Sequence, residues 1–289
     1  MIAIDLDGTL LSPSNDVTPR TRAAIHRALE AGLLVCFATG RNLTESQAII
    51  DSVGHHSTAV FVGGAMVIDM QQRVTLHRMG MAPELAAEVC GVLEQMGHVA
   101  LALQDTGAAG VDYLITRDAP QNDATVQWMK ATEAKFHLVP NLGQYDHPHT
   151  MRVGIVAEPQ EVAHVVDELR SQFEGRIICH RLFVPAYGVE VMEVFDPAVN
   201  KWEGIMHVAR RHGITAAQIV AIGDDINDVP MLKQAGLGVA MGNAKPEIQA
   251  IAKRVIKSNR DEGLAEFLEE LVEQHLVEPE PTTPRELPR

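Results

Sequence analysis

The pattern of apolar and polar positions along the 289-residue chain alternates between short apolar runs and amphipathic stretches. The first run, from Ile2 to Leu6, predicts a strand, and a proline-led stretch with apolar residues at helical spacing follows up to Gly32. The next run, in LLVCFATGR, is continuously apolar, as expected of a parallel strand covered on both faces. A helix to about Asp51 comes after it. This β-α-β-α order predicts a doubly wound, mostly parallel α/β sheet of the Rossmann type.

A different pattern begins near residue 80. Before it, the segment AVFVGGAMVID predicts two short strands around a tight turn at Gly63–Gly64. After it, the elements come in mixed order: a helix in 83–97, strands in 98–105 and 112–118, a helix in 124–135, a loop in 139–149, then a strand in 151–158, a helix in 161–173 and strands in 176–184 and 189–195. We interpret this block as a smaller α/β domain inserted into the first, with joints at Arg78–Pro83 and Pro185–Val191.

The first domain resumes after the insertion. A helix over Asn200–Arg211 leads to the buried strand QIVAIGDD, and a further helix leads to the strand GLGVAM. Two helices, NAKPEIQAIA and DEGLAEFLEELVEQ, flank the short strand RVIKS. The predicted organisation is therefore a core of residues 1–80 and 190–275, an inserted cap of residues 81–189, and a tail of residues 276–289 that is expected to be disordered because it is rich in proline and charge.

Charge and composition exclude several classes of partner. A formal net charge of −14 speaks against binding to nucleic acid or to an anionic membrane, and no apolar run approaches the ~18 residues that a membrane span needs. The chain begins with a strand and without a charged leader, so a cytoplasmic location is expected, as a monomer or small homo-oligomer. The scattered cysteines, Cys36, Cys90 and Cys179, are interpreted as reduced core residues.

Candidate chemistry begins at the end of the first strand. In a strand, residues i and i+2 point to the same side, so Asp5 and Asp7 are expected to share a face, and Gly8 allows a sharp turn after them. Two neighbouring carboxylates repel each other unless a divalent cation bridges them or one is protonated. A pair of neighbouring carboxylates suits a catalytic site in which one acts as the nucleophile and the other as the acid/base. For this motif alone, a solvated turn or a calcium-binding loop is the alternative.

Four separated motifs then point to one family. DLDGTL at the start, ATGR at residues 38–41, Lys201 at the start of a helix and IGDDINDVPML at residues 222–232 together resemble the haloacid dehalogenase superfamily of phosphotransferases. The later segments GLGVAMGNAKPEI and SNRDEGLAEFL resemble its Cof-type branch, whose members carry an α/β cap inserted between the second and third motifs. The resemblance covers the chain except the tail.

The resemblance implies a role for each acid. Asp5 would attack phosphorus to form an aspartyl phosphate, and Asp7 would protonate the leaving alcohol and then activate the hydrolytic water. Mg²⁺, a hard cation that prefers oxygen ligands, would be held by Asp5, the main-chain carbonyl of Asp7, and Asp224. Asp228 would orient the waters on the metal, and Asn227 would reach the phosphate or the metal shell.

Other motif residues are candidates for binding the substrate. Thr39 and Gly40 would offer a hydroxyl and backbone N–H groups to a phosphate, and Lys201 would add a compact positive charge. Outside the family pattern, such a threonine is usually a turn residue and such a lysine is usually solvated. Arg41 would contact substrate or lock its loop through a salt bridge, and Asn243 would contact substrate, order the loop facing the site or cap a helix.

Some polar residues are expected to have no catalytic role. Asp225 is interpreted as a surface acid, and four cap residues are interpreted as solvated loop positions, although they could line the way to the substrate: His147, His149, His180 and Arg181. Cof-type sequences commonly have Asn-Gly at the hairpin where this chain has Gly63–Gly64. The glycine keeps the turn geometry, but a substrate contact made by that asparagine is not carried over.

The sequence therefore favours a Mg²⁺-dependent phosphatase that acts on a small phosphorylated metabolite, such as a sugar phosphate. A cap that closes over the site excludes bulk water and reads the leaving group, which suits small substrates. One alternative is a phosphomutase of the same branch, which would retain a bisphosphate intermediate. Another is a non-catalytic phospho-aspartate switch of the receiver type, although receivers are about half this length and lack an inserted domain.

Overall fold

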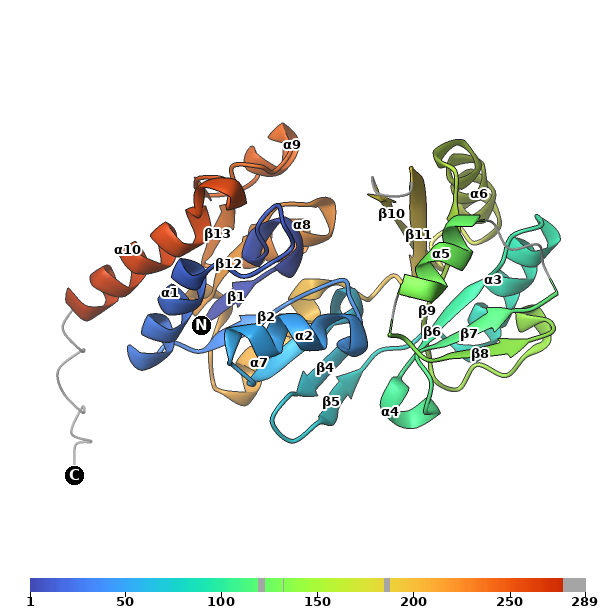
Figure 1. The fold of residues 1–289 in the computed structure, drawn as a ribbon, viewed down its shortest axis with the longest axis horizontal. Helices are drawn as coiled ribbons and strands as arrows, with labels where there is room; N and C mark the ends of the chain where they lie inside the picture. Colours follow the sequence, from blue (N-terminus) through green and yellow to red (C-terminus); the bar gives the residue numbers. More distant parts are fainter. Residues whose placement is uncertain (119–122, 132, 185–187, 278–289) are drawn as a thin grey trace, which may run out of the picture. The chain divides into compact units, whose positions relative to one another are not determined.

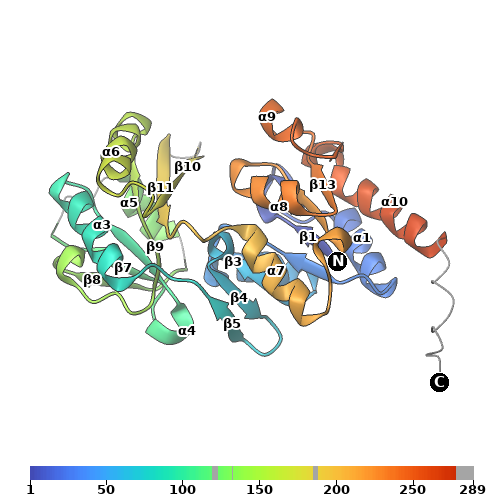
Figure 2. The same cartoon turned by 180° about the vertical axis from the view of Figure 1, so that it is seen from behind.

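The computed structural model describes residues 1–118, 123–131, 133–184 and 188–277. Figure 1 and Figure 2 show the fold from opposite sides. The chain forms two compact units. The first contains Met1–Phe37 and the described residues from His212 onward, and the second contains the described residues of Ala38–Arg211.

The first unit is built on a five-stranded sheet with the order β14-β13-β12-β1-β2. Its strands are β1 (Ile2–Ile4), β2 (Val35–Phe37), β12 (Val220–Gly223), β13 (Leu237–Ala240) and β14 (Arg254–Val255). All neighbouring strands are parallel, which confirms the predicted sheet type. Ile4 lies opposite Ile222, so the residues that follow β1 and β12 leave the sheet at the same edge. That edge carries the acidic motifs DLDGTL and IGDDINDVPML.

The described helices of the first unit are α1 (Pro19–Glu30), α8 (Val229–Gln234), α9 (Pro246–Gln249) and α10 (Gly263–Val277). Helix α1 begins where the sequence predicts it, because Pro19 suits a first turn and the Thr18 side chain accepts a hydrogen bond from the Thr21 N–H. Its apolar face, with Ala24 and Ile25, is buried. Both views show α1 lying beside α10.

The second unit begins with α2 (Leu43–Val53) and an antiparallel sheet of β3 (Thr58–Phe61), β4 (Met66–Asp69) and β5 (Val74–Arg78). The predicted hairpin around Gly63–Gly64 is confirmed, whereas β5 was not predicted. Helix α7 (Lys201–Arg211) packs on this hairpin (Figure 2). A Cβ on Gly64 would lie 2.0 Å from the carbonyl oxygen of Asn200, so this approach requires glycine.

A six-stranded sheet with the order β10-β11-β9-β6-β7-β8 forms the rest of the second unit. Its strands are β6 (Leu101–Gln104), β7 (Tyr113–Thr116), β8 (Phe136–Val139), β9 (Thr150–Ala157), β10 (Ile178–Val184) and β11 (Val189–Phe195). Its helices are α3 (Pro83–Gln95), α4 (Thr106–Ala109), α5 (Asp123–Ala131) and α6 (Pro159–Gln172). Helices α3 and α6 pack together and share a core with the sheet. The mixed α/β block is confirmed, although β8 was not predicted.

Two predicted boundaries differ from the observed elements. Strand β11 pairs with β10 as far as Phe195 and with β9 as far as Val194, so the sheet continues beyond the predicted joint at Pro185–Val191. Of that joint, residues 185–187 lie outside the described residues, as do residues 278–289 of the predicted tail. Helix α10 reaches Val277, two residues into that tail. The division into a core and an inserted cap of residues 81–189 stays a prediction.

The three cysteines are free thiols in apolar surroundings, as predicted. Cys36 and Cys90 are buried and Cys179 is half-buried. Burial raises the pKa of Cys36 to about 12, which keeps this thiol protonated at neutral pH. Among the residues that the structure describes, no helix has both the length and the apolar character of a membrane span.

Candidate active site

The first acidic motif is wound into a turn. Strand β1 ends at Ile4, earlier than predicted, because the N–H groups of Leu10 and Leu11 donate to the carbonyls of Asp5 and Leu6 and coil the chain. Asp5 is buried, whereas Asp7 lies within the turn and is exposed. The prediction that strand alternation places both acids on one face therefore does not apply. The two carboxylates instead lie in different environments, which suits different chemical tasks.

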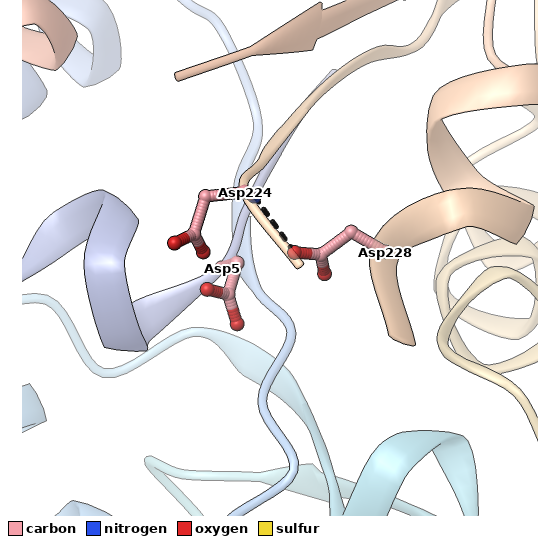
Figure 3. A group of neighbouring side chains, drawn as sticks. All are labelled: Asp5, Asp224 and Asp228. Atoms are coloured by element: carbon pink, nitrogen blue, oxygen red, sulfur yellow. Dashed lines mark hydrogen bonds between the residues drawn. The ribbon is translucent and has the colours of Figure 1, made fainter. Parts of the chain in front are cut away.

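Three carboxylates meet at the edge where β1 and β12 end (Figure 3). Asp5 follows β1, Asp224 follows β12, and Asp228 ends the short turn η5 (Ile226–Asp228). One oxygen from each lies within 4.8 Å of the others. Asp5 and Asp228 are buried and Asp224 is half-buried. Such a concentration of negative charge favours a cation or a bound proton.

Asp228 holds the loop that carries Asp224. Its Oδ2 accepts hydrogen bonds from the main-chain N–H groups of Asp224, at 2.9 Å, and Asp225, at 3.1 Å. A Cβ on Gly223 would lie 2.4 Å from the Asp228 Cγ, so glycine makes room for this carboxylate. The half-buried Asp225 carboxylate accepts from the Ile226 N–H.

Asn243 joins separate loops around the carboxylates. Its Nδ2 donates to the carbonyl oxygen of Gly8 at 2.9 Å and to Asp224 Oδ2 at 3.1 Å, and its Oδ1 accepts from the Asn259 N–H at 2.9 Å. Asn259 in turn donates to the carbonyl oxygen of Leu11. Of the roles considered for Asn243, these contacts favour ordering of the loops. The contribution of Asn259 was not predicted, although it lies in the quoted SNRDEGLAEFL segment.

Gly8 is required where the first turn meets Asp224. Its φ is +76°, a conformation that residues with a Cβ rarely adopt. A Cβ at this position would also lie 2.1 Å from Asp224 Oδ2. The glycine therefore allows the backbone of the first motif to approach the carboxylate of the last motif.

In the second unit, Thr39 lies in a tightly hydrogen-bonded loop and is fully buried. Its N–H donates to the carbonyl oxygen of Val60, and its own carbonyl accepts from the Gly63 N–H, each at 2.9 Å. Its Oγ1 accepts from the Arg41 N–H at 3.0 Å. Gly40 and Arg41 are half-buried. The loop is thus ordered by the neighbouring hairpin.

Lys201 is buried at the start of α7, with 1% of its surface exposed. A lysine is seldom fully buried unless its charge is compensated, so the solvated alternative does not describe this residue. Its charge acts on the buried Glu193: burial raises the pKa of Glu193, while the charges of Arg152 and Lys201 oppose this rise. Asn227, in η5, is half-buried.

His147 differs from its predicted solvated position. It is 1% exposed, with Nδ1 at 2.9 Å from Thr150 Oγ1 and Nε2 at 2.8 Å from the carbonyl oxygen of Leu142. Burial lowers its pKa, although hydrogen bonding to Leu142 opposes this effect. Both ring nitrogens of His147 are hydrogen-bonded within the second unit, so we interpret its role as structural.

The donor set of the carboxylate cluster fits a hard divalent cation. All three side chains offer oxygen, which Mg²⁺ prefers, whereas zinc sites usually include nitrogen or sulfur ligands. Asp5 and Asp224 each offer a carboxylate oxygen that could bind such a cation. Asp228 uses Oδ2 for main-chain contacts.

A carboxylate cluster at the carboxyl edge of a parallel sheet lies where folds of this kind bind their ligands. The profile of the haloacid dehalogenase-like hydrolase family matches residues 2–268. The chain therefore belongs to the haloacid dehalogenase-like hydrolases, and the resemblance inferred from its motifs is confirmed.

Relatives and solved structures agree with this assignment. A Bacillus subtilis 5-amino-6-(5-phospho-D-ribitylamino)uracil phosphatase is 29% identical, covering 93% of this chain and 96% of that protein. An HMP-PP phosphatase of Serratia proteamaculans is 26% identical, covering 93% and 94%. A haloacid dehalogenase-like hydrolase structure from Bacteroides thetaiotaomicron superposes with a TM-score of 0.77 at 22% identity, covering 93% and 98%. The predicted fold and the assignment to the phosphatases of this superfamily are confirmed.

Proposed function

We propose that this protein is a Mg²⁺-dependent phosphomonoester hydrolase that acts on a small phosphorylated metabolite through an aspartyl phosphate. The observation that carries the proposal is the meeting of Asp5, Asp224 and Asp228 at the sheet edge. Relatives along nearly the whole chain bear the names of phosphatases for small phosphorylated compounds. A sugar phosphate or a related phosphomonoester is the proposed substrate.

Asp5 is the proposed nucleophile. Its position at the end of a buried strand fixes its carboxylate, and a fixed nucleophile needs little reorganisation to attack phosphorus in line. Asp7 is the proposed acid/base. Because Asp7 is exposed in its turn, it can give a proton to a leaving alcohol and later take one from water.

Mg²⁺ would be held by Asp5, the main-chain carbonyl of Asp7, and Asp224. When bound, it would neutralise charge on the phosphoryl oxygens. Asp228 supports this set by fixing the Asp224 main chain and orienting ordered water, and Asn243 supports it by fixing the Asp224 carboxylate.

Thr39, Gly40 and Lys201 are proposed to bind phosphoryl oxygens, with Asn227 as a further contact. A threonine hydroxyl and main-chain N–H groups donate hydrogen bonds without adding charge, and lysine adds a compact positive charge. Burial strengthens such interactions because water no longer competes for the same oxygens. Arg41 is proposed to contact the substrate from the same loop.

The test is phosphate release from a panel of phosphorylated sugars, nucleotides and cofactors, with Mg²⁺ and with chelator. We expect metal-dependent release by the wild type and none by Asp5→Asn, because an amide does not replace the nucleophile. Asp7→Asn should abolish turnover. Asp225→Asn is the matched control, since that carboxylate accepts from the main-chain N–H groups of Ile226 and Asp228 and is not part of the carboxylate cluster, and it should stay near wild type. Release that survives in Asp5→Asn would contradict the proposal.

A further inference from the structure

Arg152 is a buried cation that the catalytic proposal leaves unused. It lies on β9 with 8% of its surface exposed, and it forms an ion pair with Glu193 of the adjacent strand β11. Its guanidinium also lies 5.8 Å from the ring centre of Phe195 and 3.5 Å from the Tyr113 hydroxyl. One further contact leaves the sheet: Nη1 donates to the carbonyl oxygen of Gly40 at 3.1 Å.

Packing alone does not account for this arginine. Bringing two charges out of water is costly, and apolar residues of similar volume often stabilise such a site as well or better. The guanidinium differs from an apolar side chain because its planar group donates hydrogen bonds in fixed directions. One of these hydrogen bonds goes to the carbonyl oxygen of Gly40, in the loop proposed to bind phosphate.

The contact is transmitted to Thr39 through one peptide bond. The Gly40 carbonyl and the Arg41 N–H belong to the same planar unit, so fixing the carbonyl also fixes the direction of the N–H. That N–H donates to Thr39 Oγ1 at 3.0 Å. Because the hydroxyl accepts this bond, its single proton is left to donate elsewhere.

The same loop is tied to the six-stranded sheet at two more places. Thr44 Oγ1 donates to the buried Asp112 at 2.7 Å, and the Tyr113 hydroxyl donates to Glu45 Oε1 at 3.4 Å. Thr44 and Glu45 lie in the first turn of α2, directly after the loop. Gly40, Thr44 and Glu45 are therefore held by side chains of β9, of β7 and of Asp112, which directly precedes β7.

We propose that Arg152, oriented by Glu193, is a positioning residue that fixes the Thr39 hydroxyl for a phosphoryl oxygen. The inference rests on the proposed function, in which Thr39 binds the phosphoryl group. It adds a determinant that lies more than a hundred residues away in the sequence and that touches no reacting atom itself.

A double-mutant cycle with p-nitrophenyl phosphate and Mg²⁺ tests the proposal. We expect Arg152→Met and Thr39→Val each to lower kcat/KM about tenfold or more, as loss of a phosphate hydrogen bond does. The double variant should be no worse than Thr39→Val, because Arg152 acts through that hydroxyl. Arg152→Lys, which keeps a donor, should restore part of the loss. Arg176→Met is the matched control, since Arg176 pairs with Glu88 on the surface of the same sheet unit.

Several outcomes would overturn the inference. Losses that multiply in the double variant would show that Arg152 acts independently of Thr39, and an Arg152→Met enzyme with wild-type kcat/KM would show that it has no role. Urea unfolding of each variant separates a folding defect, and if Arg152→Met fails to fold, Arg152→Gln and Arg152→Lys complete the cycle. A wild type that releases no phosphate from this compound or the panel would overturn the proposed function itself, together with this inference.

Discussion

The Oδ2 atom of Asp228 accepts a hydrogen bond of 2.9 Å from the main-chain N–H of Asp224. The same oxygen accepts a second hydrogen bond from the main-chain N–H of Asp225. The Asp228 carboxylate therefore holds the loop that carries the Asp224 side chain. Because Asp224 is a proposed metal ligand, Asp228 is expected to influence metal binding by holding Asp224 in place.

Asp228→Asn should weaken Mg²⁺ binding about 10- to 100-fold, because an amide accepts with one atom only and brings N–H groups toward two main-chain donors. Mg²⁺ titrations of activity and of Tm measure the change. In the wild type, Mg²⁺ should raise Tm and chelator should reverse the rise, since a cation relieves the repulsion within the cluster. Asp225→Asn should titrate like the wild type. An unchanged Mg²⁺ midpoint in Asp228→Asn would contradict the anchoring role.

Gly8→Ala should destabilise the protein by at least about 2 kcal/mol and lower its affinity for Mg²⁺. The added methyl would meet Asp224 Oδ2 in a backbone conformation that disfavours alanine. Gly32→Ala is the matched control, because its φ is +82° but nothing lies within 4 Å of the added Cβ. It should cost only about 1 kcal/mol and leave the Mg²⁺ midpoint unchanged. Urea unfolding measures the backbone strain, which both variants share. Mg²⁺ titration detects the displacement of Asp224, which is expected in Gly8→Ala only.

Gly63→Asn should be tolerated, with a free energy of unfolding within about 1 kcal/mol of the wild type. The φ of Gly63 is +63°, which asparagine adopts more readily than most residues, and the added Cβ would lie 3.5 Å from the Phe195 ring. Gly64→Ala, one residue on, should destabilise by about 3 kcal/mol or more, since its Cβ would meet the Asn200 carbonyl. If urea unfolding gave Gly63→Asn a loss as large as the one expected for Gly64→Ala, the hairpin would tolerate neither side chain.

Stability should fall in mild acid partly because of His147. Burial lowers its pKa in the folded state, although the nearby charges of Asp146 and Glu94 oppose the change. Below the ordinary pKa of 6.5, the unfolded chain therefore binds protons more readily than the folded one, and the free energy of unfolding decreases as pH falls.

The check is urea unfolding of the wild type and of His147→Gln from about pH 7.5 to about pH 5.5. The variant should lose less stability over this range, because glutamine does not titrate. The pKa values of His98 and His207 are also lowered by burial, but both residues remain in each protein and cancel in the comparison. Parallel pH dependence of the two proteins would remove His147 as a source of the acid sensitivity.

Much of this fold was predictable because its signals are local. Continuous apolar runs correspond to the parallel strands, and amphipathic periods correspond to helices such as α1 and α3. The strands β5 and β8 were missed for a physical reason. Their residues are mostly exposed or half-buried, so neither strand shows a strong apolar run, and each forms through pairing with a neighbour at a sheet edge.

By itself, the sequence determined the family and most of the elements in order, and it predicted the acids of the candidate site, because short motifs and hydrophobic periods are properties of neighbouring residues. Only the tertiary structure decided how those acids and the loop of Thr39 are supported. The contacts of Asn243 with Gly8 and of Arg152 with Gly40 join segments 235 and 112 residues apart. Such contacts depend on which strands become neighbours and on which polar groups are buried together, and local patterns carry little information about either.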